Sequence, residues 1–88
     1  YIDQGAVRAL NEGKSLLPAG IIKVEGSFEK GENILIVDEN EKGLARGLSS
    51  FTSSEINKIK GKQSKEIENI LGYLSKSEII HKDDMVKL

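Results

Sequence analysis

The stretch Ile34-Leu35-Ile36-Val37-Asp38-Glu39-Asn40-Glu41-Lys42-Gly43-Leu44-Ala45-Arg46-Gly47-Leu48 has the pattern of a β-hairpin. Its opening run, Ile34 to Val37, is wholly apolar and has the length of a strand covered on both faces. Residues 38–43 are polar and form the connection, after which Leu44 to Leu48 returns as the second strand. On that strand Gly43, Ala45 and Gly47 share one face, where another backbone can approach closely.

The sequence before this hairpin predicts one short helix and a tight connection. Asp3 is a suitable N-cap for a helix from about Gln4 to Glu12, and Gly13 stands where a left-handed stop is expected. Pro18 is the only proline, and it restricts Leu17 to an extended conformation.

A second strand is expected between this connection and the hairpin. Ile22 and Val24 alternate with charged neighbours, which predicts a half-buried strand over residues 22–25. Residues 26–31 follow as a turn, with Phe28 as its aromatic anchor.

Beyond the hairpin the apolar period becomes helical. Residues 52–55 read Thr-Ser-Ser-Glu, a capping box that opens a helix ending near Gly61. Ser64 is expected to cap a second short helix that stops at Gly72, and residues 79–80 and 85–88 return to β structure. The chain is therefore predicted to be mainly β with short flanking helices, an α+β fold.

Length and composition limit what the chain can do. Its 88 residues form one domain with one modest core, and neither a linker nor an internal repeat divides residues 1–88. Because it begins with Tyr1 and enters structured sequence at once, we interpret it as a fragment of a longer protein. It has no cysteine, which excludes disulfides and thiolate chemistry and is compatible with a cytoplasmic location. Its longest apolar run, residues 34–37, is far short of the roughly 20 residues that span a bilayer, so no membrane partner is expected.

The net charge of the chain argues against a general nucleic-acid-binding domain. The net charge is −1, whereas phosphate-binding domains usually carry a basic excess. One basic cluster stands out, formed by Lys58, Lys60, Lys62 and Lys65. It suits an anion or RNA-backbone surface, or simply a solvated helix end whose lysines favour the helix dipole. It contains no aromatic residue for stacking on bases.

The candidate catalytic motifs in the sequence are incomplete. His81 is the only histidine, and a triad with Asp83 and a serine is one reading, but a structural or surface role is the alternative that we favour. A lone histidine lacks the clustered ligands of a metal site, and Asp83-Asp84 is typical of a polar turn. Gly26 and Gly31 have the spacing of P-loop glycines, yet Glu32 follows where a lysine is required. We therefore expect neither catalytic, cofactor-binding nor metal-binding residues in this chain.

Several segments together resemble the C-terminal PUA domain of glutamate 5-kinases. They are Ile2-Asp3-Gln4-Gly5-Ala6, Gly13-Lys14-Ser15-Leu16-Leu17-Pro18-Ala19-Gly20, Val24-Glu25-Gly26-Ser27-Phe28, Ala45-Arg46-Gly47-Leu48, Ile59-Lys60-Gly61-Lys62 and Ile79-Ile80-His81. The resemblance covers essentially the whole chain, and its most specific element is the run from Gly13 to Gly20. Two positions depart from the family's pattern: Phe51 stands where a tyrosine is usual, and Lys82 where an arginine is usual.

This resemblance implies a PUA-like pseudo-barrel and a missing upstream amino-acid-kinase domain. In the family that domain phosphorylates the γ-carboxylate of glutamate with ATP and Mg, the first step of proline synthesis, so the cofactors belong to the absent part. The expected partners are the kinase domain itself and other subunits of a homo-oligomer. A docking module of this kind is expected to expose an apolar patch.

RNA is the alternative partner that the resemblance implies. PUA domains of tRNA-modifying enzymes bind RNA through the glycine-rich segment after the first helix and a neighbouring strand. By position, these residues are Lys14, Ser15, Leu17, Gly20, Arg46 and Gly47. The other reading is that Gly20 and Gly47 only satisfy turns and packing.

Overall fold

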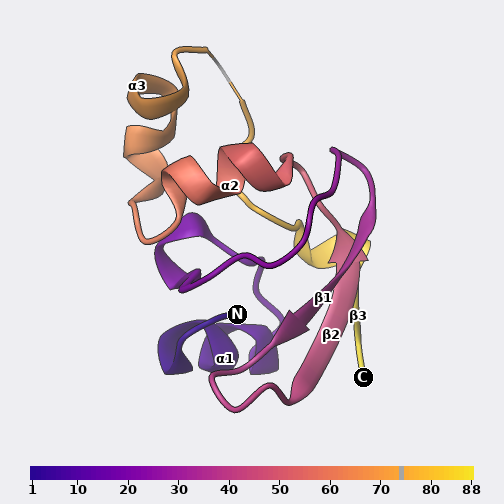
Figure 1. Ribbon diagram of the computed structural model, residues 1–88. Helices are drawn as coiled ribbons and strands as arrows, with labels where there is room; N and C mark the ends of the chain where they lie inside the picture. The colour runs from indigo at the N-terminus through magenta and orange to yellow at the C-terminus, as the bar shows by residue number, and fades with distance from the viewer. Residues whose placement is uncertain (74) are drawn as a thin grey trace.

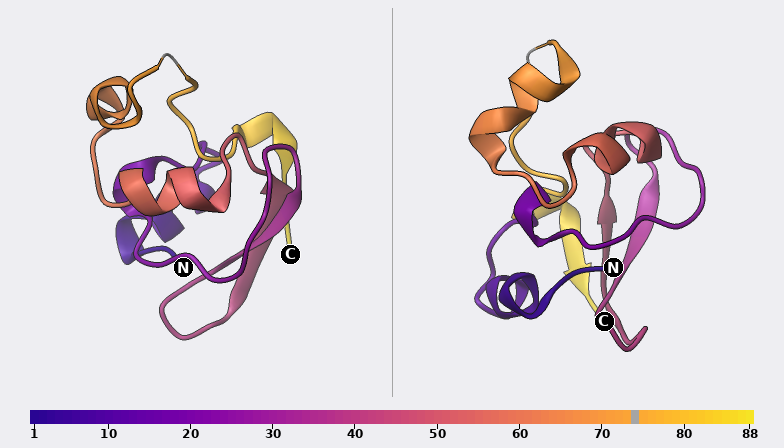
Figure 2. Two further views of the ribbon diagram at one scale, coloured as in Figure 1. Left: turned by 45° about the horizontal axis from the view of Figure 1, so that its top comes forward. Right: turned by 60° about the vertical axis from the view of Figure 1, so that its left-hand side comes forward.

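The computed structural model describes residues 1–73 and 75–88, and it is built from short helices and one small sheet. In chain order the elements are α1 (Gln4–Asn11), η1 (Pro18–Gly20), β1 (Asn33–Val37), β2 (Gly43–Leu48), α2 (Ser53–Ile59), η2 (Ser64–Glu66), α3 (Ile67–Leu71), η3 (Lys82–Asp84) and β3 (Met85–Lys87), where η marks a 3₁₀ turn. Figure 1 shows α1 and α2 on one side of the sheet and α3 farther from it, and the two views of Figure 2 agree. The predicted α+β class is confirmed.

The hairpin is the centre of an antiparallel sheet of strand order β1-β2-β3. Leu35 pairs with Arg46, which in turn pairs with Val86, so the predicted two-strand unit gains a third strand from the end of the chain. The turn is stabilised by Asp38, whose Oδ1 accepts hydrogen bonds from the backbone N–H groups of Asn40 and Lys42 at 2.8 and 3.0 Å. Such Asx contacts are the reason that aspartate favours turns.

One expectation for β1 is wrong: the strand is covered on one face, not two. Ile36 is buried, but Leu35 keeps 45% of its side-chain surface exposed. The helices pack only on the face that carries Ile36, and an apolar run in sequence cannot show that the second layer is missing. The same inner face carries Ala45 and Gly47, both of which are buried. The expectation that Gly43 shares this face is wrong: the pairing register shifts between Ile36 and Val37, so Gly43 faces Leu35 and Leu88 instead.

The strand expected over residues 22–25 is absent from the part of the chain that the structure describes. Ile22 is 47% exposed, and this segment pairs only with the first residues of the chain. The backbone N–H of Ile22 donates to the carbonyl of Tyr1 at 2.8 Å, and Ile2 donates to Val37 at 3.0 Å. These contacts join the segment to β1 only through residues 1–2. Because residues 22–25 do not form a strand, the sheet stays open and does not close into a barrel.

Most predicted helix boundaries are confirmed. Asp3 accepts a hydrogen bond from the N–H of Ala6 at 2.8 Å, and Thr52 and Glu55 form both halves of the capping box at 3.1 and 2.8 Å. Gly13 and Gly72 have φ values of 77° and 84°, the left-handed geometry that ends helices.

The cap assigned to Ser64 is wrong. Ser64 lies inside η2, and its hydroxyl donates to the carbonyl of Ser77 at 3.3 Å. The backbone N–H of Gln63 instead donates to Glu66 at 2.9 Å. A side-chain carboxylate from within the first turn therefore does the capping.

The core lies between the inner sheet face, α1 and α2. Its buried apolar residues are Ile2, Leu10, Leu16, Ile21, Ile36, Ala45, Phe51, Ile56, Ile59, Ile67, Ile79 and Ile80. Phe51 is 1% exposed, so its aromatic ring is fully buried. Residues 79–80 form only an isolated bridge, in which Ile80 pairs with Leu16, instead of the expected strand.

Among the described residues, no helix has both the length and the apolar character needed to cross a membrane.

Candidate functional site

The segment from Lys14 to Gly20 connects α1 with the core and carries four of the predicted site residues. Ser15 is tied to the far end of the chain, because its Oγ accepts a hydrogen bond from the N–H of Lys82 at 2.8 Å. Leu17 is 46% exposed, and Lys14 forms an exposed ion pair with Glu12 at 3.1 Å. A shallow hollow of about 310 Å³ lies between this segment and α1.

Gly20 has a packing role. A Cβ atom placed on it would lie 2.5 Å from the Cβ of Ala6, a distance that real side chains do not tolerate. Its carbonyl also accepts a hydrogen bond from the N–H of Asp3 at 3.0 Å. Gly20 therefore lets the connection lie directly on the first turn of α1.

Close packing also explains why a glycine stands at position 47, but it does not explain the arginine at position 46. Gly47 faces Ile80 and the carbonyl of Asp84, whereas Arg46 points to the opposite, exposed face of β2. Ser15 and Gly47 both contact the segment around η3, Ser15 at Lys82 and Gly47 at Ile80 and Asp84. Arg46 lies on the other side of the sheet and does not join them.

The lysine segment, residues 58–65, runs from the end of α2 into η2. Lys58, Lys62 and Lys65 are exposed, and Nζ of Lys60 donates to Oδ1 of Asn57 at 3.1 Å. The N–H of Gly61 donates to the carbonyl of Pro18 at 2.8 Å. This hydrogen bond places the lysine segment next to η1, so two of the predicted basic and glycine-rich regions are neighbours.

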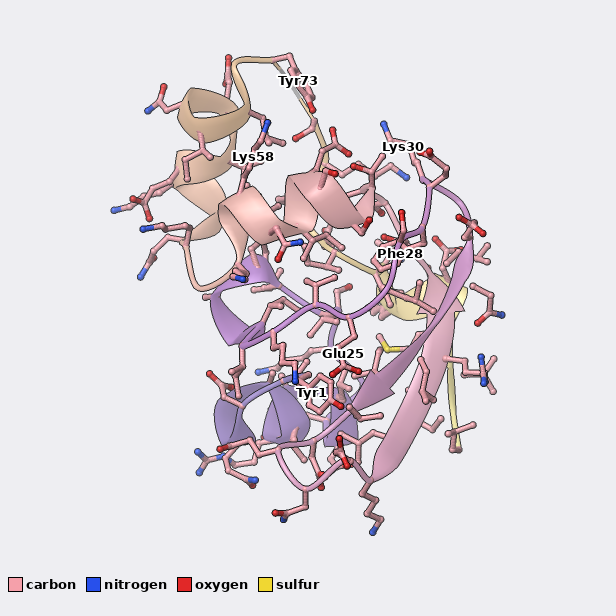
Figure 3. The ribbon with its side chains drawn as sticks, in the orientation of Figure 1. Tyr1, Glu25, Phe28, Lys30, Lys58 and Tyr73 are labelled. Carbon is pink, nitrogen blue, oxygen red and sulfur yellow. The ribbon has the colours of Figure 1, made fainter. Side chains whose placement is uncertain are left out.

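A polar cluster around Tyr1 was not anticipated from the sequence. The Tyr1 hydroxyl donates to Glu41 at 2.8 Å and lies 3.3 Å from Glu25, while Nζ of Lys23 sits 4.7 Å from the centre of the ring. Figure 3 shows Tyr1 and Glu25 side by side, next to the end of β1. The hydrogen bond to Glu41, with burial and the charge of Glu25, raises the pKa of Tyr1 to about 12. The hydrogen bond from Lys23 lowers the pKa of Glu25.

A second unanticipated contact joins Tyr73 to Glu55 of the capping box. Burial alone raises the pKa of the Glu55 carboxyl, but hydrogen bonds from Tyr73 and Thr52 outweigh it and lower this pKa below its ordinary value. Figure 3 shows Tyr73 above α2, beyond the end of α3. Both clusters join residues that are far apart in sequence, so a local sequence motif does not predict them.

His81 has a structural contact. Its Nδ1 accepts a hydrogen bond from the N–H of Asp83 at 3.1 Å, which caps η3, and the Asp83 carboxylate lies 3.6 Å away in the open. Within residues 1–73 and 75–88, the side chains of His, Asp and Glu do not gather into a group able to hold a metal ion.

The PUA domain family model matches residues 1–71. This chain belongs to the PUA domain family. Two solved PUA domains share its fold: one from Aeropyrum pernix K1, in complex with tartrate, at a TM-score of 0.65 and 23% identity, covering 91% of this chain and 39% of that one; and one from Thermoplasma acidophilum at 0.60 and 21%, covering 91% and 45%.

The relatives matched by sequence are one kind of enzyme, matched over a PUA-length segment. The chain is 62% identical over 87 residues to the glutamate 5-kinase of Pelagibacter ubique, covering 99% of this chain and 24% of that protein. It is 52% identical over 85 residues to that of Bartonella henselae, covering 97% and 22%. The predicted resemblance to the PUA domain of glutamate 5-kinases is confirmed. This PUA domain spans about a quarter of the length of the relatives it matches.

Proposed function

We propose that this chain is the non-catalytic accessory domain of a glutamate 5-kinase. The observation that carries the proposal is the identity of 52–62% to glutamate 5-kinases over 97–99% of the chain. The phosphoryl transfer, from ATP with Mg to the γ-carboxylate of glutamate, then takes place in a kinase domain outside these residues. The product opens proline synthesis, and a cytoplasmic location follows for such an enzyme.

The chemistry of the described residues supports an accessory role. The one histidine, His81, caps a 3₁₀ turn. Close packing accounts for the two glycines at predicted site positions, Gly20 and Gly47. A catalytic centre needs a nucleophile, base or metal held beside a substrate position, and nothing of this kind is assembled by the contacts above. The domain is therefore expected to act on the kinase through assembly or regulation.

Deleting this domain from the full-length protein tests the proposal. The intact protein is expected to form γ-glutamyl phosphate and ADP from glutamate and ATP. The truncated protein is expected to keep some phosphoryl transfer while changing its oligomeric state or its sensitivity to proline. If the truncation left activity, oligomeric state and proline sensitivity all unchanged, the accessory role would be wrong.

A second candidate function, RNA binding, is favoured by one observation: the hydrogen bond from Gly61 to Pro18 places the lysine segment beside η1. Binding of structured RNA should then weaken steeply as salt rises, and the combined variant Lys62→Glu/Lys65→Glu should lower the salt slope by about 0.7–0.9 per lost phosphate contact. Lys42→Glu, at the hairpin turn, is the matched control. Absence of binding at low salt would exclude this function.

A further inference from the structure

The face of the sheet that the helices leave bare is mainly apolar, with one cation and one amide. It consists of Asn33 and Leu35 on β1, Arg46 and Leu48 on β2, and Val86 and Leu88 at the end of the chain, and we name it the outer sheet face. Leu35 and Leu48 are each 45% exposed, and Val86 and Leu88 are 71% and 70% exposed. Leu35 and Val86 are the direct cross-strand neighbours of Arg46, so apolar side chains flank this cation on both sides within one face.

Such a surface is unusual for a domain that works alone. Small monomeric domains rarely expose contiguous apolar side chains across a whole sheet face, and those that do generally use the face for association. Among the described residues, the guanidinium of Arg46 has no acidic group within ion-pair distance. A partner that fits is therefore apolar and places a carboxylate opposite Arg46.

The position of Tyr1 favours a partner on the same polypeptide. Tyr1 bonds Glu41 at 2.8 Å and so lies at the hairpin end of the sheet. At this same end, atoms of Leu88 and Leu35 lie 3.1 and 3.7 Å from where a Cβ of Gly43 would stand. Because the N–H of Ile2 donates to the carbonyl of Val37, chain that precedes Tyr1 in a longer protein starts at the free edge of β1, and the relatives are about four times the length of this chain.

We propose that the outer sheet face docks on the kinase domain of the same polypeptide, a step that rests on the function proposed above. Tethering through Tyr1 gives this contact a high effective concentration, so it needs less area than a contact between free proteins. A second copy fits less well. None of the face's side chains is acidic, and a two-fold contact of the face with itself brings two Arg46 cations into one interface without a counter-charge.

Hydroxyl-radical footprinting of the full-length protein tests the proposal, because the chain supplies matched controls. Leu17 and Ile22 are exposed to 46% and 47%, like Leu35 and Leu48, but Leu17 lies beside α1 and Ile22 is separated from β1 by residues 1–2. We expect the labelling of Leu35 and Leu48 to be at least threefold lower than that of Leu17 and Ile22. Equal labelling of the two pairs, whether all are protected or all are open, would overturn the proposal.

Two variants identify the occupant. Leu48→Glu in the full-length protein is expected to restore labelling of Leu35 while leaving the sedimentation coefficient unchanged, and Ile22→Glu is expected to change neither. If Leu48→Glu reduces the oligomer size while Ile22→Glu does not, a second copy covers the face and the proposal is wrong. Glutamate phosphorylation is measured separately: a full-length protein without this activity contradicts the proposed function, whereas the footprint tests the docking face regardless of activity.

Discussion

Gly47 on β2 lies directly against Ile80, so closely that a Cβ atom on Gly47 would stand 2.7 Å from Cγ2 of Ile80 and 2.9 Å from the carbonyl oxygen of Asp84. Because Ile80 is fully buried and the second contact is to backbone, neither neighbour can move aside easily. This glycine therefore fixes how the end of the chain packs under the sheet.

Gly47→Ala is expected to destabilise the domain by about 1–3 kcal/mol, the usual cost of overpacking a core. Urea unfolding of the 88-residue domain measures the change. Gly5→Ala is the matched control, because its Cβ would meet only Asp3 at 3.4 Å and alanine favours the helix. A Gly47→Ala domain as stable as the wild type would show that the close contact is relieved at no cost.

Thr52→Ala is expected to cost about 1 kcal/mol of stability, because it removes the side-chain acceptor for the N–H of Glu55 at the start of α2. Thermal or urea unfolding measures the loss. Ser54→Ala, at an exposed position in the same first turn, serves as the control and should be close to neutral. Equal effects of the two substitutions would argue against the capping box as a source of stability.

Deprotonation of Tyr1 should require strongly alkaline conditions. Its folded-state pKa of about 12 lies above the unfolded value near 10, so the stability contributed by its hydrogen bonds is complete below about pH 10 and is lost as pH rises through 12. Ultraviolet titration of phenolate in a Tyr73→Phe background, which leaves one of the two tyrosines, reports this pKa. Glu41→Gln should shift the titration toward 10, and Glu39→Gln should not.

The acid side of the stability profile should depend on Tyr73. The pKa of Glu55 is lowered in the folded state, so its contribution is present above the unfolded pKa near 4.5 and is lost as pH falls through the folded value. Tyr73→Phe removes one hydrogen bond to this carboxylate and should move acid unfolding to higher pH. Ser75→Ala is the control, because the Ser75 hydroxyl donates to the carbonyl of Lys76 and not to a carboxylate, and it should leave the acid midpoint in place.

The elements that could be predicted from sequence are those whose determinants are close together in the chain. The cap at Asp3, the capping box from Thr52 to Glu55 and the polar turn of the hairpin each depend on residues within a few positions of one another. Their side-chain hydrogen bonds are local, so sequence spacing alone identifies them.

The errors and omissions involve long-range contacts. Whether Leu35 is buried depends on a second layer that never forms over the outer sheet face, and its sequence context does not report this. Residues 22–25 alternate like a strand, but their backbone pairs with Tyr1, through Ile22 and Lys23. For the candidate site, the contacts that explain Gly20 and Gly47 come from Ala6 and Ile80, and the bond between Tyr1 and Glu41 spans 40 positions.

The hydrogen bonds around the first residues also have a mechanical consequence. Tyr1 donates from its nitrogen to the carbonyl of Lys23 at 2.9 Å, a donor that survives as an amide N–H in a longer chain, and Ile22 and Ile2 add bonds to Tyr1 and Val37. A pull transmitted through the preceding polypeptide meets these bonds before it reaches the core. In a longer protein, a movement of a domain attached through Tyr1 should therefore act first on the edge of β1. From there the force passes directly to the hairpin.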